Sequence, residues 1–420
     1  MNASVLILGA GLAGLRCGIE LLHKRPSLQV VLLEKYTYTG GRVVTYHKTL
    51  DTLKGPCKKL QWENGAGRIS LSHKKVMALL HKYKLTQVPI GDEVLFEENG
   101  FLSPNLFTDA SRAVFASLEG LPSSVLGTKT LREILETTLG KQETERLLIQ
   151  FPYRAEVDTL RADLGLRAFQ EEMGTYKGYC VIQEGLSAIV EGMRKEFESL
   201  GGTLLHSHEV KDISKNQGGL SVLCETPAGP VLWEAPTVIC ALHRDAMAEI
   251  PFFQGWKTLS KLRMEPLLRT YAVFPVEKGT SWFANLPKVV NKGPIRFFLP
   301  MNPACGTVMI SYTESQDARA LMHRIDKDGE EATGKWIVQQ VRQMFPDRTI
   351  PDALFFKAHP WTSGCTYWLP GSYDVEEESK KSLKPFSDLN LYCCGESFSL
   401  RQAWMEGALE QADLLLKTYF

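Results

Sequence analysis

The residues best suited to chemistry stand near the N-terminus, where three glycines follow the spacing GxGxxG. Residues 9–14 read GAGLAG and lie between an apolar run, 5–8, and a segment with helical periodicity. Glycines at this spacing permit a tight turn, a close approach of backbone to a pyrophosphate, and close packing of helix on strand. A second apolar run, 29–33, ends at Glu34, where a carboxylate can accept hydrogen bonds from a ribose. The chain is therefore predicted to bind a dinucleotide through Gly9, Gly11, Gly14 and Glu34.

A second glycine pair follows Glu34 and leads into an arginine. Residues 39–43 read TGGRV, so Gly41 and Arg42 can add a further backbone approach and a guanidinium beside the same pyrophosphate. Dehydrogenases that bind only NAD have no use for this second contact. The pattern therefore separates the chain from that class.

These motifs together resemble the N-terminus of the flavin-containing amine oxidase superfamily, which includes monoamine, polyamine and amino-acid oxidases. Residues 62–69 (WENGAGRI) are similar to the family segment that lines the flavin, and residues 183–186 (QEGL) to its glycine-led helix start. Residues 208–210 (HEV) are similar to the strand whose valine backbone binds the adenine. Residues 395–409 contain GES and WMEGAL, similar to the C-terminal motif in which a helix N-terminus faces the flavin ring.

The resemblance implies FAD as the cofactor, bound non-covalently or through a thioether. It assigns cofactor contacts to Gly9, Gly11, Gly14, Glu34, Gly41, Arg42, Gly65, Arg68, Val210, Cys365, Gly395, Glu396 and Met405.

A finer resemblance concerns the place where a substrate would react. Residues 363–367 (SGCTY) resemble the monoamine oxidase segment whose cysteine carries FAD, and Trp404 stands where that group has one tyrosine of an aromatic cage. A half-cage of Trp404 with Tyr367 or Trp361 is implied, because ring faces favour a cationic or electron-rich nitrogen. The pattern departs from the family at Thr366. The family has an aromatic residue directly after the cysteine, whereas here Tyr367 comes one position later. An inert buried thiol at Cys365 and a packing role for Trp404 stay open as alternatives.

The family's lysine, which holds a water near the flavin, is missing from the expected position. An ungapped reading puts Glu249 there, and no lysine occurs between Lys215 and Lys257. The resemblance implies an FAD-dependent oxidase that converts a primary amine or polyamine to an imine while O2 is reduced to hydrogen peroxide. Loss of the lysine keeps two alternatives open. One is a desaturase or dehydrogenase acting on carbon–carbon bonds, like protoporphyrinogen oxidase or carotenoid desaturases; the other is an FAD-binding protein with impaired catalysis.

The elements that must position these residues begin with a strand, a helix and a strand, and then become mostly helical between residues 84 and 176. Later apolar runs near residues 268–274, 295–299 and 307–312 predict an antiparallel sheet. The expected fold class is α/β: a Rossmann-like FAD-binding domain interleaved with an α+β substrate domain of antiparallel sheet and helices. The FAD-binding domain is expected to comprise residues 1–75, 178–254 and 358–420. The substrate-binding domain is expected to comprise residues 76–177 and 255–357.

Composition excludes other classes of function. The 48 basic and 48 acidic residues give a net charge of zero, which argues against a nucleic-acid partner. No apolar stretch reaches the ~18 residues of a membrane span, and the N-terminus lacks the features of a signal peptide. Nine cysteines without CxxC spacing predict no metal site and no disulfide framework, but reduced thiols and a cytoplasmic location. The expected partners are a small amine substrate and O2; the oligomeric state stays open.

Overall fold

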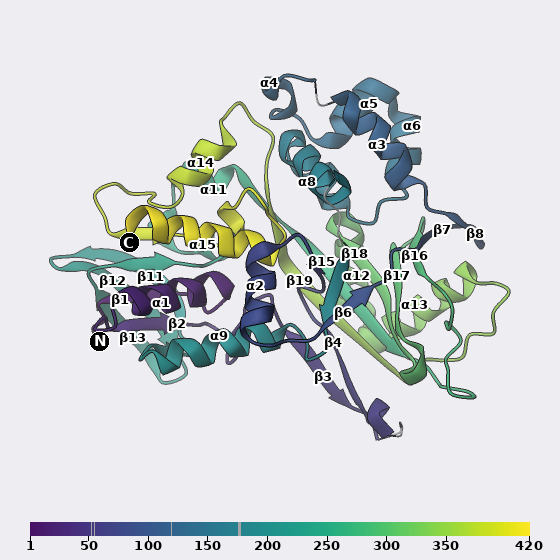
Figure 1. The fold of residues 1–420 in the computed structure, drawn as a ribbon, viewed down its shortest axis with the longest axis horizontal. Coiled ribbons are helices and arrows are strands. Elements are labelled where there is room, and N and C mark those ends of the chain that lie inside the picture. The colour runs from purple at the N-terminus through teal and green to yellow at the C-terminus, as the bar shows by residue number, and fades with distance from the viewer. Residues whose placement is uncertain (52, 54, 119, 175–177) are drawn as a thin grey trace.

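The computed structural model describes the 420-residue chain except for residues 52, 54, 119 and 175–177. In Figure 1 the half that contains the parallel sheet and both ends of the chain lies to the left. A large antiparallel sheet lies to the right, and a group of short helices covers it from above. The two halves are each built from several separate segments of the chain, as expected for interleaved domains.

A five-stranded parallel sheet forms the centre of the left half. Its strands, in the order β10, β2, β1, β14, β20, are β10 (Thr203–Leu205), β2 (Val30–Leu33), β1 (Val5–Leu8), β14 (Val238–Cys240) and β20 (Leu391–Cys393). The inner strands are apolar throughout because both faces of the sheet are covered. Val5 and Ile7 pack toward helices on one face, whereas Leu6 and Leu8 pack toward a second sheet on the other.

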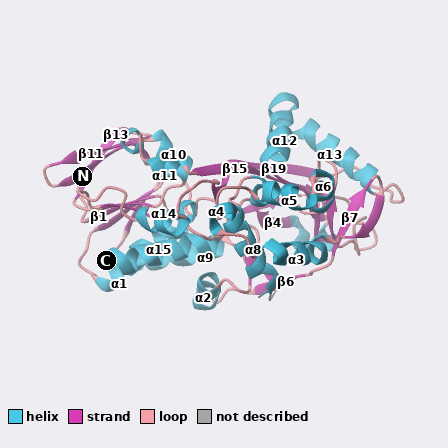
Figure 2. Cartoon of the chain, turned by 90° about the horizontal axis from the view of Figure 1, so that it is seen from above, coloured by secondary structure: helices cyan, strands magenta, loops and turns pink. Residues whose placement is uncertain are grey.

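Figure 2 shows these layers edge-on, with helices on one side of the parallel sheet and a three-stranded antiparallel sheet on the other. The helices are α1 (Leu12–Lys24), α9 (Ser187–Ser199) and α15 (Met405–Tyr419), and the strands are β11 (Glu209–Asn216), β12 (Gly219–Thr226) and β13 (Gly229–Ala235). Because α1 packs against both α9 and α15, the first motif of the chain depends on its last helix.

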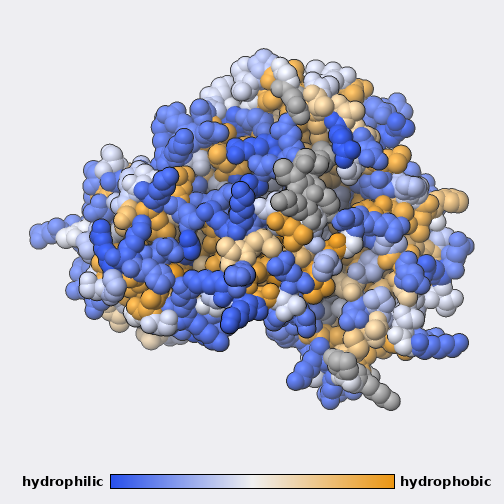
Figure 3. Space-filling view, in the orientation of Figure 1, coloured by the Kyte–Doolittle hydropathy of each residue, from blue (hydrophilic) through white to orange (hydrophobic). Residues whose placement is uncertain are grey.

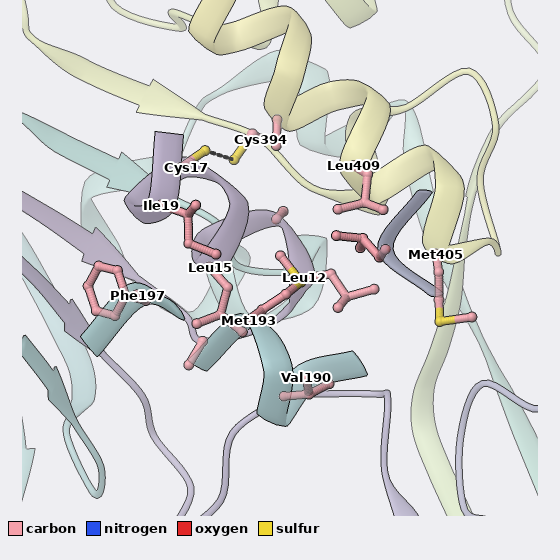
Figure 4. Close-up of a cluster of buried hydrophobic side chains, with 14 of the residues drawn as sticks. Leu12, Leu15, Cys17, Ile19, Val190, Met193, Phe197, Cys394, Met405 and Leu409 are labelled. Carbon is pink, nitrogen blue, oxygen red and sulfur yellow. Dashed lines mark hydrogen bonds between the residues drawn. The ribbon is translucent and has the colours of Figure 1, made fainter. Parts of the chain in front are cut away.

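The contact between these helices is a closely packed apolar cluster (Figure 4). Leu15 and Ile19 of α1 lie among Met193 of α9 and Leu409 of α15, and all are buried. The thiols of Cys17 and Cys394 are hydrogen-bonded in the same cluster, with their Sγ atoms 3.7 Å apart, and do not form a disulfide. Removing a large side chain here would leave a cavity that costs about 2–5 kcal/mol.

The right half is a seven-stranded sheet in the order β19, β15, β18, β17, β16, β7, β8. Its members are β19 (Phe355–Trp368), β15 (Leu262–Val273), β18 (Thr307–Glu314), β17 (Phe297–Asn302), β16 (Lys288–Asn291), β7 (Val94–Glu98) and β8 (Phe101–Pro104). All neighbours are antiparallel except β16 and β7. Two helices, α12 (Ser315–Asp328) and α13 (Glu330–Met344), cover one face, and the opposite face is turned toward a cavity.

Shorter elements join the two halves. They are β3 (Thr45–Thr49), β4 (Lys59–Glu63), β5 (Ile69–Ser70), α2 (Lys74–Lys82), β6 (Gln87–Ile90), β9 (Tyr179–Ile182), α10 (Arg244–Glu249), α11 (Lys257–Ser260) and α14 (Val375–Lys381). The helices above the sheet have their own core and are α3 (Phe107–Leu118), α4 (Ser123–Leu126), α5 (Leu131–Leu139), α6 (Lys141–Leu148), α7 (Arg154–Asp158) and α8 (Ala162–Gly174). A capping box at Thr130 and Glu133 starts α5.

The structure departs from the sequence predictions in three places. The segment expected to be mostly helical also supplies β6, β7 and β8, because β6 and β7 pair with strands far along the chain and β8 forms a hairpin with β7. The expected domain boundary between residues 357 and 358 falls inside β19, which pairs with β15 from end to end. Cys57 and Cys305 form a disulfide, so the expectation of reduced thiols is wrong for this pair, which is separated by 248 residues in sequence.

The surface shows no helix suited to a bilayer. None of the helices formed by the described residues is long and apolar enough to cross a membrane. On the face drawn in Figure 3, hydrophilic and hydrophobic side chains are interspersed.

Candidate active site

One cavity of about 1250 Å³ extends from the parallel sheet to the face of the seven-stranded sheet. Gly11 and Glu34 line it at the first end, which we call the nucleotide end. Trp404, Tyr312 and Arg269 line it at the second, which we call the reaction end. All residues for which the sequence predicted a contact with cofactor or substrate line this cavity, with the exception of Gly14.

The glycine loop at the nucleotide end has the shape of a phosphate cradle. A Cβ added to Gly14 would lie 2.0 Å from the carbonyl oxygen of Gly9, so this glycine lets α1 pack on β1. A Cβ added to Gly11 would meet no protein atom within 4 Å, and one added to Gly41 would lie 3.9 Å from Gly11 Cα. Gly11 and Gly41 thus present bare backbone to one open space at the start of a helix, which fits a pyrophosphate.

Glu34 ends β2 with its carboxylate fixed by backbone. The amide of Ala10 donates to Oε2 and the amide of Tyr36 to Oε1, each at 2.9 Å. Burial raises the pKa of Glu34, although these bonds oppose the shift. A carboxylate offers about four acceptor positions, so two bonds leave room for ribose hydroxyls. Val210 lies near by, because the amide of His208 donates to the Glu34 carbonyl oxygen at 2.8 Å.

Arg42 and Glu396 connect two of the predicted cofactor motifs directly. Arg42 Nη2 lies 2.9 Å from Glu396 Oε2, and Nη1 donates to the carbonyl of Gly364 at 2.8 Å. Glu396 also accepts from the amides of Thr366 (3.0 Å) and Ala403 (2.8 Å). The Arg42 guanidinium lines the cavity. It also ties β19 to the segment that precedes α15.

Trp404 precedes α15 and lies among aromatic and cationic groups at the reaction end. Its ring is parallel to that of Tyr179, with an interplanar angle of 6° and centroids 6.2 Å apart. The Arg68 guanidinium lies 4.3 Å from the Tyr179 centroid and 5.4 Å from that of Trp404. His73 meets Trp404 edge-on at 4.8 Å, and burial lowers the pKa of His73 to about 4. The Trp404 ring therefore faces a guanidinium of the protein itself.

Tyr367, Trp361 and Cys365 all belong to β19 and line the cavity. Trp361 Nε1 donates to the carbonyl oxygen of Asn64 at 3.0 Å, which ties the sheet to the loop at Gly65. Tyr367 is fully buried, and burial raises its pKa well above the ordinary value. Burial, followed by the nearby Glu396 and Glu314 carboxylates, raises the pKa of the Cys365 thiol.

The wall opposite α15 contains residues that sequence reasoning missed. Leu267, Arg269 and Tyr271 of β15 face the cavity, while Leu268 and Ala272 face α12 and α13. This alternation is the period of two of a strand. Arg269 is the only charged residue in the run 266–276, and that isolated charge was the available signal.

Glu314 and Tyr312 complete this wall from β18. A register shift where β18 passes Thr270 and Tyr271 leaves Met309, Tyr312 and Glu314 all lining the cavity. The Tyr312 hydroxyl donates to Glu314 Oε1, and the amide of Ala155 lies 3.4 Å from Oε2. Burial raises the pKa of Glu314 to about 7. The spacing of these residues in the sequence cannot predict that all three side chains line the cavity, because the register shift decides the direction in which they point.

Glu249 lies at the nucleotide end, where its charge acts on Lys35. The placement of Glu249 at the position of the family's lysine stays a prediction. Arg269 and Lys288 are the cations that line the reaction end from the seven-stranded sheet.

Comparisons with known proteins agree with this geometry. A family model described as flavin containing amine oxidoreductase matches residues 127–414, and one described as NAD(P)-binding Rossmann-like domain matches residues 7–83. Uncharacterized protein R188 of Acanthamoeba polyphaga mimivirus is 21% identical over 501 residues, covering 100% of this chain and 94% of that protein. Two putrescine oxidase variants from a structure-based redesign of cofactor binding have similar structures. Their TM-scores are 0.75 and 0.74, with 15% and 16% identity, over 99% and 100% of both chains.

Proposed function

Because the chain belongs to the flavin-containing amine oxidoreductases, we propose that it binds FAD and oxidises an amine to an imine, with O2 reduced to hydrogen peroxide. Family membership makes it a flavin-dependent oxidase. The observation that carries the finer proposal is the continuous cavity, which joins a pyrophosphate cradle at Gly11 to a reaction end at Trp404. A cofactor with a nucleotide at one end and a reactive ring at the other fits a cavity of this length.

The chain's own residues divide the work of holding this cofactor. The backbone at Gly11 and Gly41 would face the pyrophosphate, Glu34 a ribose, and Val210 the adenine. Gly65, Gly395 and Met405 would border the ring, with the N-terminus of α15 directed at it. Bound FAD would supply the two-electron chemistry and the electrons for O2, which no side chain can supply.

The reaction end supplies orientation and a dry environment. Trp404, Tyr367 and Trp361 would form aromatic walls that exclude water from the reacting carbon and nitrogen. Since a neutral amine needs no base to lose hydride equivalents, the pH dependence of turnover would include deprotonation of the substrate amine.

We propose non-covalent attachment. Thioether formation needs a thiolate, and burial with two nearby carboxylates raises the pKa of Cys365 and keeps its thiol protonated.

Anaerobic mixing of the FAD-loaded protein with a panel of amines and amino acids tests the proposal. Bleaching of the flavin followed by peroxide release on admission of O2 is the expected result. Bleaching by a polyene or a polycyclic substrate without peroxide would favour a desaturase instead. A flavin that no member of the panel bleaches would contradict the proposed activity.

A further inference from the structure

Two arginines lie on adjoining aromatic rings at the reaction end. The Arg68 guanidinium lies 4.6 Å from the centroid of Tyr153, and that of Arg269 lies 5.1 Å from the centroid of Tyr312. The two tyrosine rings are themselves in contact, with centroids 5.7 Å apart. Lys288 lines the same end, and the charge of Arg68 acts on it. Three cationic side chains are thus gathered around one space.

Arg269 forms no ion pair with any carboxylate of the described residues, and its Nε is buried without a hydrogen-bond acceptor. Its other contacts are with uncharged groups. Nη1 lies 3.8 Å from Met309 Sδ, the plane faces Tyr312, and the guanidinium is hydrogen-bonded to the Tyr271 side chain. Aromatic faces and sulfur attract a cation but do not neutralise it. The guanidinium therefore has donors available to an anion that enters the cavity.

Two of the carboxyl groups near these cations are only partly ionised at neutral pH. Glu314 and Glu63 line the cavity and act on Arg269, and burial raises the pKa of each to about 7. Glu156 and Asp92 also lie near these cations. A substrate whose charges are all positive would meet like charges in a space with little water, which is unfavourable.

We propose that the substrate is an amine that also carries a carboxylate, and that Arg269 receives this carboxylate. The inference rests on the proposed function, because it specifies which class of amine is oxidised. A guanidinium presents paired N–H donors that match the two oxygens of a carboxylate. The unpaired donor of Arg269 therefore favours amino carboxylates over polyamines.

A set of probes that share one ring and differ in charge tests this assignment. Benzoate, benzamide and benzylamine are titrated into the FAD-loaded protein near neutral pH, and binding is followed by the change in flavin absorbance and by equilibrium dialysis. Benzoate is expected to bind about tenfold or more tightly than benzamide, as befits a charge-assisted hydrogen bond, and benzylamine more weakly than either.

Variants locate the effect. Arg269→Gln is expected to weaken benzoate binding about tenfold or more while benzamide binding stays unchanged. Arg269→Lys, which keeps the charge, should retain part of the preference. Arg263→Gln is the matched control, since Arg263 lies on the same strand with 58% of its side chain exposed, and it should leave all three affinities unchanged.

The result that overturns the assignment is benzylamine as the tightest probe, or benzoate affinity that survives Arg269→Gln. Failure of the proposed function would look different. Benzoate binding through Arg269 with no amine able to bleach the flavin would uphold the subsite and refute the oxidase activity. Turnover of amines together with tightest binding of benzylamine would uphold the oxidase activity and refute the carboxylate subsite.

Discussion

Gly67 and Arg269 compete for the same volume. A Cβ added to Gly67 would lie 2.2 Å from Nη1 of Arg269, well inside any normal contact. The glycine of the WENGAGRI segment therefore leaves room for a guanidinium that reaches across from β15. Two segments that the sequence separates by some two hundred residues are matched in this way at the reaction end of the cavity.

Gly67→Ala is expected to displace the Arg269 guanidinium and to weaken benzoate binding severalfold. The displaced atoms are the end of a flexible side chain, so the free energy of unfolding should change by less than about 1 kcal/mol. Fluorescence titration and urea unfolding measure the two effects. Gly218→Ala in an exposed turn is the control. In an Arg269→Gln background, Gly67→Ala should have no further effect on benzoate; a second loss of similar size would refute the relationship.

Glu314 is expected to make benzoate binding depend on pH. Its pKa of about 7 means that it is neutral below this value and negative above it, so affinity should fall as the pH rises through about 7. Tyr312, Arg68 and Arg269 face this carboxyl group and keep their protons in that range, but Glu63, which acts on Arg269, also has a pKa of about 7. Titrations with benzoate from about pH 5.5 to about pH 8.5 should therefore show a smaller transition in Glu314→Gln than in wild type. Equal profiles would exclude Glu314 as the titrating group.

Loss of Arg42 is expected to destabilise the fold around Glu396. The Glu396 side chain is 7% exposed and that of Arg42 is 27% exposed, so Arg42→Met leaves a buried carboxylate without its cation. We expect a loss of about 2–4 kcal/mol in the free energy of unfolding by urea. Arg194→Met removes surface pairs to Glu191 and Glu198 on α9 and should cost less than about 1 kcal/mol. Similar losses in both variants would mean that the Arg42 pair is no stronger than a surface pair.

Acid precipitation is expected to release the flavin. Because the Cys365 thiol is protonated, the yellow colour should remain in the supernatant, and Cys365→Ser should bind flavin as wild type does. Absorbance of the two fractions is the measurement. A yellow pellet from wild type, absent in the variant, would establish a covalent bond at Cys365.

His359 is expected to destabilise the protein in mild acid. It accepts a hydrogen bond from Trp62 Nε1 at 2.9 Å, and burial, followed by Lys357, lowers its pKa from 6.5 to about 4. The unfolded chain therefore binds a proton before the folded one does, and this contribution is lost as the pH falls below 6.5. From about pH 7.5 to about pH 5 the loss should be about 2 kcal/mol. Over the same pH range, the free energy of unfolding by urea should fall by that much less in His359→Gln than in wild type. Parallel plots of this free energy against pH for the two proteins would contradict the assignment.

Local patterns were sufficient to predict the nucleotide end. The apolar runs and the spacing of Gly9, Gly11 and Gly14 lie within one βαβ unit. They therefore predict β1, α1, β2 and the position of Glu34 without any information from distant segments. The same holds for α9, α13 and α15, whose apolar residues recur with helical period.

Pairing between distant segments could not be read in this way. The sequence did not predict β19, because its strand conformation depends on pairing with β15. It did not predict β7 either, because that strand depends on pairing with β16. The disulfide joins Cys57 to Cys305 only because the β3–β4 hairpin reaches the turn after β17, and no spacing rule connects them. At the reaction end, Arg269 and Glu314 acquire their directions from alternation and a register shift within the sheet. Trp404 was expected to help guide an amine, which stays a prediction, and no local pattern indicated that the Arg68 guanidinium lies near its ring.

The strand order of the parallel sheet also constrains how the molecule is made. β1 and α1 are made before β14, β20 and α15, yet β14 and β20 extend their sheet and α15 covers α1. During synthesis the apolar face of α1 therefore stays uncovered until α15 has been made. The glycine loop therefore reaches its final packing only when these distant elements are in place.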